Sequence, residues 1–311
     1  MRVAFLGNAA WSVPSLEALA ASSHVTVVVA TRTPRPARRG SGLVPTPVAE
    51  AARTLGLPLL EVDTVKSGEG FVALAGSEPD ALAVVAYGEI FPVSVLALPK
   101  VAPVNLHFSL LPELRGASPV QGAILAGLAR TGVTSIRMDE GMDTGPILLQ
   151  MEEAIRPEDD FGSLGERLAS LGGRILVSTL DQLEDGALNE RPQDNAAATY
   201  APKLKPEDRV IAWERPAEEI VRLVRAMAPE PGATTTFRGR GLKVLRASPA
   251  AAGSLRAGHV MLAAEGEGVV VGTGDGGVRL EEVAPEGRRR MSGAEFIRGY
   301  RPEAGEILGQ D

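Results

Sequence analysis

Short apolar runs alternate with longer stretches of helical length through the first half of the chain. The runs RVAFLG, VTVVVA, ALAVVAY, PVNLHF and VTSIRM have the length and the β-branched content of buried strands. The stretches between them are rich in alanine and leucine. This alternation predicts β-α-β units, and therefore an α/β domain built on a mostly parallel sheet.

One helix carries boundary signals at both ends. In SPVQGAILAGLARTG, Ser118 is expected as the N-cap, Pro119 as the first helical residue and Gln121 as the second member of a capping box. Gly132 closes the stretch and is expected just past the end of the helix. The helix therefore begins directly after the motif PVNLHFSLLP, which carries polar residues of interest.

A second, amphipathic helix is expected over Phe161–Leu183, interrupted by Gly172 and Gly173. A polar, turn-rich stretch follows, and then a helix over Pro216–Met227 gives way to closely spaced strands with glycine turns. That last pattern predicts a small β-barrel.

We therefore expect an α/β domain over residues 1–187, a linker over 188–208 and a barrel domain over 209–311. The 311 residues, 44% of them apolar, suffice for two cores. The net charge of −7 argues against a protein that coats nucleic acid indiscriminately, because that mode neutralises many phosphates. The chain has no cysteine, which excludes disulfides, thiolate metal sites and cysteine nucleophiles. Without a signal peptide or a membrane-length apolar run, we expect a soluble, cytoplasmic protein.

The run VNLHF holds the first candidate chemistry. In a strand, Asn105 and His107 point to the same side, at the carboxyl end where open α/β sheets bind ligands. The loop MDEGMDTGP after the next run supplies Asp139, Glu140 and Asp143. Asn, His and Asp together suit acyl transfer, with donors for a developing oxyanion and a group that handles an amine proton. A satisfied core histidine and a solvated turn aspartate are the alternative interpretation.

Other site classes lack their motifs. The chain has no G-x-S-x-G nucleophile elbow and no H-E-x-x-H, and His24 and His259 are far from His107 in sequence, so we expect neither a serine hydrolase nor a metal site. GTGDGG at Gly272–Gly277 matches a dinucleotide fingerprint literally, but it stands between two late strands and is better explained as a hairpin turn. No NAD site is expected.

Two basic segments are candidates for contact with phosphate. The loop TRTPRPARRGSG carries Arg32, Arg35, Arg38 and Arg39. Between residues 221 and 248 the sequence has six basic residues and a single acidic one, Glu230. The basic residues are Arg222, Arg225, Arg238, Arg240, Lys243 and Arg246. Such runs are either solvated surface or an RNA-backbone contact.

Four segments together resemble the methionyl-tRNA formyltransferases: NLHFSLLPELRGASPVQGAI, DEGMDTGPIL, AYGEIFP and RPARRGSGLVPTPV. The resemblance runs essentially end to end. It implies a Rossmann-like formyl-transfer domain, an OB-like barrel that contacts tRNA, 10-formyltetrahydrofolate as co-substrate without metal or NAD, and initiator methionyl-tRNA as acceptor. We expect a monomer that binds no membrane.

The resemblance also implies roles for individual residues. Asn105, His107 and Asp143 fall on the catalytic positions. The folate-binding residues are expected to be Ser109, Leu110, Leu111 and Pro112, together with Tyr87, Gly88, Glu89 and Ile90. The tRNA-binding residues are expected to be Arg35, Arg38, Arg39, Arg222, Arg238 and Lys243. Phe108, Glu89 and Glu230 depart from the family pattern; Phe108 is expected to face away from the site by strand alternation.

Several rivals stay open. A sugar-nucleotide formyltransferase shares the folate machinery, and a formyltetrahydrofolate hydrolase would transfer to water. A glycinamide ribonucleotide formyltransferase usually ends near the first domain. A protein that binds RNA and has lost catalysis would keep the basic segments without needing Asn105, His107 and Asp143.

Overall fold

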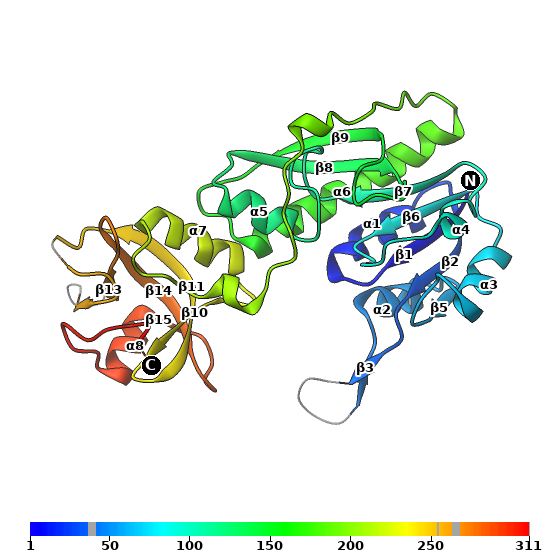
Figure 1. Cartoon of the computed structure of the whole chain (residues 1–311). Helices are drawn as coiled ribbons and strands as arrows, with labels where there is room; N and C mark the ends of the chain where they lie inside the picture. Colours follow the sequence, from blue (N-terminus) through cyan, green and yellow to red (C-terminus); the bar gives the residue numbers. More distant parts are fainter. Residues whose placement is uncertain (37–41, 254, 263–267, 311) are drawn as a thin grey trace. The chain divides into compact units, whose positions relative to one another are not determined.

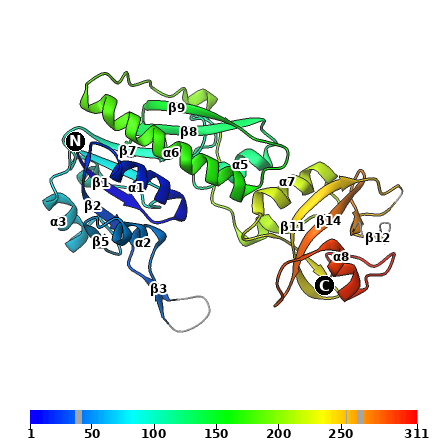
Figure 2. The same ribbon diagram turned by 180° about the vertical axis from the view of Figure 1, so that it is seen from behind.

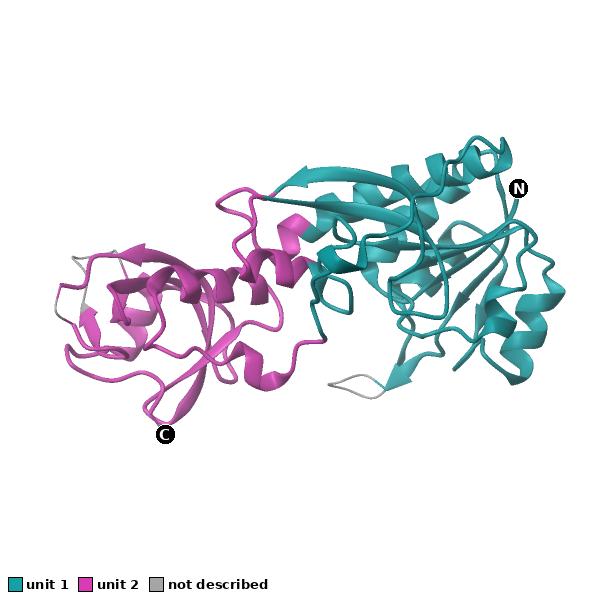
Figure 3. Cartoon of the chain, turned by 45° about the horizontal axis from the view of Figure 1, so that its top comes forward, with its two compact units in different colours: residues 1–119, 130–154, 165–202 teal, residues 120–129, 155–164, 203–311 magenta. Residues whose placement is uncertain are grey.

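In the computed structural model, which describes residues 1–36, 42–253, 255–262 and 268–310, the chain forms two compact units. The first comprises Met1–Pro119, Arg130–Ala154 and Gly165–Pro202, and the second comprises Val120–Ala129, Ile155–Leu164 and Lys203–Asp311 (Figure 3). Residues 188–202, which the sequence analysis assigns to a linker, belong by their contacts to the first unit.

The first unit is built on one sheet. Its strands in the described residues are β1 (Arg2–Gly7), β2 (Val25–Thr31), β5 (Leu59–Glu61), β6 (Ala81–Val85), β7 (Ala102–His107), β8 (Arg130–Arg137) and β9 (Ile147–Ala154). Their order is β5-β2-β1-β6-β7-β8-β9 (Figure 1). The pairings from β5 to β7 are parallel, as predicted, and β8 and β9 run antiparallel.

Helices cover both faces of this sheet: α1 (Val13–Ala20), α2 (Pro47–Thr54), α3 (Gly68–Gly76), α4 (Val93–Leu96) and α6 (Phe161–Glu184). Alternate residues of β1 point to opposite faces, and both sets are buried. Ala4 and Leu6 share a core with Leu74 of α3 and Val95 of α4. On the other face lie α1 and α6, seen in front of the sheet in Figure 2. Burial on both faces explains the unbroken apolar runs of the parallel strands.

The helix α6 is continuous, so the predicted interruption at Gly172 and Gly173 is wrong. The glycines serve close packing instead. A Cβ on Gly173 would lie 2.9 Å from the carbonyl oxygen of Pro14 and 3.1 Å from the Cβ of Ala18, both in α1. A Cβ on Gly172 would meet Leu106 at 3.4 Å, an ordinary contact. Gly173 therefore allows α6 and α1 to approach more closely than a side chain would permit.

The helix after the SLLP turn is shorter than predicted. α5 covers Pro119–Leu125, and Gly132 lies inside β8 rather than past the helix end. The chain leaves the helix at Gly127, whose φ of +66° is the left-handed conformation that ends many helices. Both Gly127 and Gly132 follow the helix, and the sequence pattern selected the wrong one.

The second unit is a curled antiparallel sheet, an open barrel of the OB-like kind expected. Its order is β10 (Ala233–Phe237), β11 (Arg240–Ala250), β14 (Gly277–Pro285), β13 (Val269–Gly272) and β12 (Val260–Leu262), with β15 (Met291–Ser292) paired to β14. α7 (Ala217–Met227) and α8 (Gly293–Tyr300) contribute Val224 and Phe296 to its core. Gly272 pairs with Gly277 across a hairpin, as predicted for GTGDGG.

Arg238 lies at the tip of the β10–β11 hairpin and binds the end of the chain. Its guanidinium donates to both carboxylate oxygens of Glu306, at 2.7 and 3.0 Å, and to the carbonyl oxygens of Tyr300 and Arg301. This contact holds the pKa of Glu306 below its usual value, with a smaller contribution from the backbone N–H of Glu303.

We expect opposite effects on stability from two neighbouring substitutions. Gly173→Ala should destabilise the protein by about 1–3 kcal/mol, because the new methyl group meets a backbone oxygen of α1. Gly172→Ala should be neutral or stabilise by up to about 1 kcal/mol, since it has room and alanine favours a helix over glycine. Urea unfolding of both variants measures the difference; equal stabilities would contradict this account of α6 packing.

The Arg238–Glu306 contact should make stability depend on pH. The pKa of Glu306 is lowered in the folded protein, so its contribution is present above about pH 4.5 and is lost as the pH falls through the folded value. Glu306→Gln should therefore be less stable than the parent at pH 7, and the two should converge in acid. Glu303→Gln, at the neighbouring exposed carboxyl, is the control. A parent and variant separated by the same amount at pH 7 and pH 3 would refute the contact's role.

Candidate active site

A cavity of about 540 Å³ opens where β6 and β7 end. Its wall contains the turn 86–91 after β6, the end of β7 from Asn105 to Phe108, Gly116 and Ala117, and residues of the loop 138–143. The volume lies in the range of small-molecule sites. The wall is mainly apolar, with a few polar groups from three separate segments.

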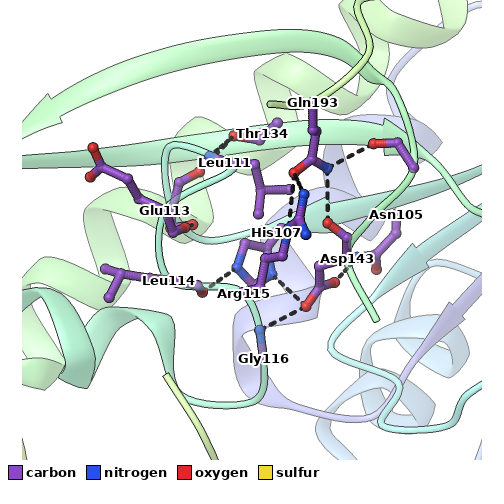
Figure 4. A network of polar contacts seen from close by, with 12 residues as sticks. Asn105, His107, Leu111, Glu113, Leu114, Arg115, Gly116, Thr134, Asp143 and Gln193 are labelled. Atoms are coloured by element: carbon purple, nitrogen blue, oxygen red, sulfur yellow. Dashed lines mark hydrogen bonds and ion pairs between the residues drawn. The ribbon is translucent and has the colours of Figure 1, made fainter. Parts of the chain in front are cut away.

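The three predicted catalytic residues meet at this cavity (Figure 4). Asn105 and His107 leave β7 on the same side, as strand alternation requires. The Nδ1 atom of His107 lies 3.5 Å from Asp143 Oδ2, and Asn105 Nδ2 makes a long contact, also 3.5 Å, with Asp143 Oδ1. The convergence predicted from sequence is therefore present in the structure.

Asp143 reaches β7 by an unexpected route. Because β8 is antiparallel to β7, Arg137 at the end of β8 lies opposite Val104 near the start of β7. The following loop must fold back over the sheet to bring Asp143 to His107. Asp143 itself has φ +57°, a left-handed conformation that is uncommon outside glycine.

His107 is buried, and both of its ring nitrogens face oxygen atoms. Nε2 lies 2.9 Å from the carbonyl oxygen of Leu114, which can only accept a hydrogen bond, so Nε2 carries a proton. Nδ1 faces the carboxylate of Asp143. The backbone N–H of Gly116 donates to the same carboxylate oxygen at 2.9 Å. The segment 114–116 therefore fixes both the histidine and the aspartate.

Sequence analysis missed two residues beside this site. Gln193 donates from Nε2 to the carbonyl oxygens of Asp143 and Gly145, and the buried Arg115 donates to Gln193 Oε1. Gln193 stands in the polar stretch assigned to the linker, where nothing in the pattern distinguishes it. Arg115 stands inside the recognised motif, but only its position in the fold shows what it touches.

The predicted folate residues divide into two groups. Tyr87, Gly88, Glu89 and Ile90 line the cavity. Ser109, Leu110, Leu111 and Pro112 do not belong to its wall; the backbone of Ser109 and Leu111 is hydrogen-bonded to the hydroxyl of Thr134 behind it. A direct contact of this second group with folate stays a prediction.

Tyr87 contributes a buried hydroxyl that has no hydrogen-bond partner among the described residues. Burial, with a smaller contribution from Glu89, raises its pKa to about 12, so the phenol stays neutral and can donate a hydrogen bond. An unpaired buried hydroxyl is unfavourable unless something else binds it. The residue belongs to the cavity wall, while its hydroxyl oxygen is itself buried.

The structure explains two of the three residues that depart from the family pattern, Glu89 and Phe108. Glu89 is nearly buried, accepts a hydrogen bond from Thr64 and pairs with Arg32 at 3.5 Å. Phe108 packs edge-on against Trp11, with ring centroids 5.8 Å apart, and also borders the cavity, so strand alternation does not exclude it from the wall.

Of the arginines in the basic loop of the first unit, the structure describes Arg32 and Arg35. Arg35 lies in β3 (Arg35–Pro36), which pairs with β4 (Leu43–Val44), and together with Arg32 it borders a second cavity of about 350 Å³ that shares Tyr87 and Gly88 with the first. Arg38 and Arg39 lie outside the described residues.

Several cations of the second unit are already paired with acids. Lys243 lies 3.2 Å from Glu230, the third departure, and Arg246 lies 3.0 Å from Glu281 of β14. Arg238 binds Glu306, as described above, while the Nε atom of Arg222 is buried without a partner among the described residues. The local charge excess counted along the chain is therefore reduced in space, because β14 and the chain end supply acids from outside the counted window.

Within the described ranges, no three His, Cys, Asp or Glu side chains are grouped so that they could hold a metal ion, and no helix is long and apolar enough to cross a membrane.

Comparison with known proteins finds a matching family for each of the two parts of the chain. Residues 1–180 match the family described as formyl transferase, and residues 203–301 match the formyl transferase C-terminal domain. Among curated relatives, the methionyl-tRNA formyltransferase of Koribacter versatilis is 44% identical, with 100% of this chain and 99% of the relative covered. That of Nocardioides sp. is 45% identical, with 99% and 98% covered.

Solved structures support the fold. The sugar 3N-formyl transferase WlaRD has a TM-score of 0.67 at 17% identity, with 93% of this chain and 99% of that chain covered. The methionyl-tRNA formyltransferase from Clostridium thermocellum has a TM-score of 0.56 at 18% identity, with 80% and 93% covered. At such identities the likeness shows the α/β and open-barrel architecture alone.

Proposed function

The chain belongs to the methionyl-tRNA formyltransferase family, and we propose that it transfers the formyl group of 10-formyltetrahydrofolate to the free α-amine of methionine on initiator methionyl-tRNA. The product, N-formylmethionyl-tRNA, serves translation initiation in the cytoplasm. The convergence of Asn105, His107 and Asp143 at one cavity carries this proposal, because it supplies the polar groups that the reaction needs.

The cavity fits the folate co-substrate. Its volume of about 540 Å³ and its mainly apolar wall suit a flat heteroaromatic ring. When bound there, 10-formyltetrahydrofolate supplies an activated formyl group. We assign Tyr87, Gly88, Glu89 and Ile90 to this contact, with the turn Ser109–Pro112 supporting the wall from behind.

The polar residues have separable roles. Asn105 Nδ2 and His107 are hydrogen-bond donors for the formyl oxygen as it gains negative charge. Because His107 Nε2 donates to the carbonyl oxygen of Leu114, the ring can donate to the formyl oxygen only from Nδ1, which has an N–H when both ring nitrogens carry a proton beside the Asp143 carboxylate. The transfer makes a bond from the amine nitrogen to the formyl carbon and breaks the bond to the folate nitrogen. One proton therefore leaves the amine, and Asp143 accepts it directly or through water, while the departing folate nitrogen takes up one proton, so the step is balanced.

We assign tRNA contact to Arg35, Arg38 and Arg39 in the first unit and to Arg222, Arg238 and Lys243 in the second. The cavity bordered by Arg32 and Arg35 adjoins the catalytic one, which suits an acceptor that carries phosphates. We further propose that the protein is a monomer.

The deciding assay follows radiolabelled formyl from 10-formyltetrahydrofolate to methionine on initiator tRNA, with methionine on elongator tRNA as control. Label on the initiator alone supports donor, acceptor and discrimination together. Label on neither, with donor consumed, would move the acceptor to a sugar nucleotide or to water. RNA binding without any transfer would indicate a protein that has lost catalysis.

Asp143→Asn should lower kcat by about 10²-fold or more, because the amide cannot accept the amine proton. The fold should survive, since the amide oxygen can still accept from the N–H of Gly116. Steady-state kinetics with a circular dichroism melt checks both parts. Turnover close to that of the parent would remove Asp143 from the mechanism.

Arg39→Ala should weaken use of tRNA and reduce the slope of log affinity against log salt by about one unit, with the KM for folate unchanged. Arg53→Ala, which removes a cation already paired with Glu61, is the matched control and should leave the slope unaltered. The measurement is tRNA binding at several salt concentrations. Equal slopes in parent and Arg39→Ala would exclude a phosphate contact at this position.

A further inference from the structure

The chain that follows α6 returns to the active site. Arg191 exchanges backbone hydrogen bonds with Ile147 in β9, at 2.8 and 2.9 Å. Farther on, the N–H of Arg115 donates to the carbonyl oxygen of Thr199, and the N–H of Ala201 donates to that of Arg115. The segment 191–201 is therefore paired with the start of β9, just after the loop that carries Asp143, and with Arg115, beside the residues that contact His107 and Asp143.

Gln193 connects these loops through its side-chain amide (Figure 4). Nε2 donates to the carbonyl oxygens of Asp143 at 2.8 Å and Gly145 at 2.7 Å. Oε1 accepts from Arg115 Nε at 3.1 Å and Nη2 at 2.7 Å. Because arginine can only donate and carbonyls can only accept, only one orientation of the amide satisfies all four bonds.

Arg115 gives this arrangement its rigidity. The residue is 3% exposed, and its guanidinium also donates to Asn195 Oδ1 at 2.8 Å. A buried cation must have its donors satisfied, since an unpaired donor inside a protein is strongly unfavourable. Arg115 therefore fixes the Gln193 amide, and the amide fixes the loop that bears Asp143.

Asp143 needs such support. Its left-handed backbone is less favourable than an ordinary one for a residue with a Cβ, so the surroundings must hold it. Gly116 holds the carboxylate end and Gln193 holds the backbone carbonyl. Without Gln193, the loop can relax and the carboxylate can move away from His107.

We propose that Gln193 is a positioning residue for formyl transfer: it holds Asp143 against His107, and Arg115 orients its amide. This role rests on the proposed function of the site. It also makes part of the expected linker a component of the active site.

Gln193→Glu removes the hydrogen bonds that the side chain donates and keeps those that it accepts. The carboxylate keeps its contact with Arg115 but cannot donate to the carbonyls of Asp143 and Gly145. We expect kcat to fall about 10-fold or more, because small misplacements of catalytic groups are costly, while both KM values stay within about twofold. Gln182→Glu, the same change on α6 away from the site, is the control and should match the parent. A parent-like kcat for Gln193→Glu would overturn the proposal.

Two further measurements distinguish positioning from a general structural role. In an Asp143→Asn background, Gln193→Glu should change single-turnover rates by less than about twofold, because it acts through Asp143. The chain has three histidines, so NMR can follow each imidazole: the signals of His107 should move, and those of His24 and His259 should not. Fully independent losses with unmoved His107 signals would contradict the proposal.

If Gln193→Glu does not fold, Gln193→Asn takes its place. It retains a neutral amide but is one methylene too short to reach Arg115 and both carbonyls, so the same loss of kcat is expected; a parent-like kcat would again overturn the role. If the parent transfers formyl to no acceptor, the proposed function fails, whereas the comparison of His107 signals still decides whether Gln193 positions Asp143.

Discussion

The left-handed backbone of Asp143 is the constraint on which the site depends. A carboxylate can reach His107 only if the loop after β8 folds back over the sheet, because β8 runs antiparallel to β7 and ends at the wrong edge. The loop therefore cannot be held by the sheet ladder. It is held by side chains and turns instead: the N–H of Gly116 on one side and the amide of Gln193 on the other.

This arrangement explains why polar groups are buried around the site. Arg115, Gln193 and the backbone of Leu114 and Gly116 form a connected set in which donors meet acceptors. Buried polar networks of this kind rigidify a structure only when they are complete, since each missing partner leaves a desolvated group. The apolar wall of the cavity and this polar frame behind it are thus two parts of one binding site.

The sequence predicts most of the architecture because its signals are local. Strand periodicity places Asn105 and His107 together, and the GTGDGG turn is correctly interpreted as a hairpin. The errors arise where the extent of a helix cannot be read from the local sequence. Gly173 packs against Pro14 instead of interrupting α6, and Gly127, not Gly132, follows the end of α5.

In the basic segment of the second unit, the local charge is likewise not predictable from the sequence alone. Counted along the chain, Arg246 and Arg238 have little acid near them. Antiparallel pairing of β11 with β14 brings Glu281 to Arg246, and the chain end brings Glu306 to Arg238. Gln193 was missed for a related reason, because a single glutamine in a polar stretch acquires meaning only from the loops that fold against it.

The pair of Arg32 and Glu89 has a consequence for how this sequence can vary. Only 7% of the Glu89 side chain and 31% of the Arg32 side chain are exposed, and the two belong to turns that follow different strands. Replacing one alone by an apolar residue leaves the other charge poorly solvated without its partner. Substitution at either position is therefore coupled to the other. The charged pair can be replaced by way of a neutral polar residue, such as glutamine, at one of the two positions. Among related sequences, positions 32 and 89 should covary although 56 residues stand between them.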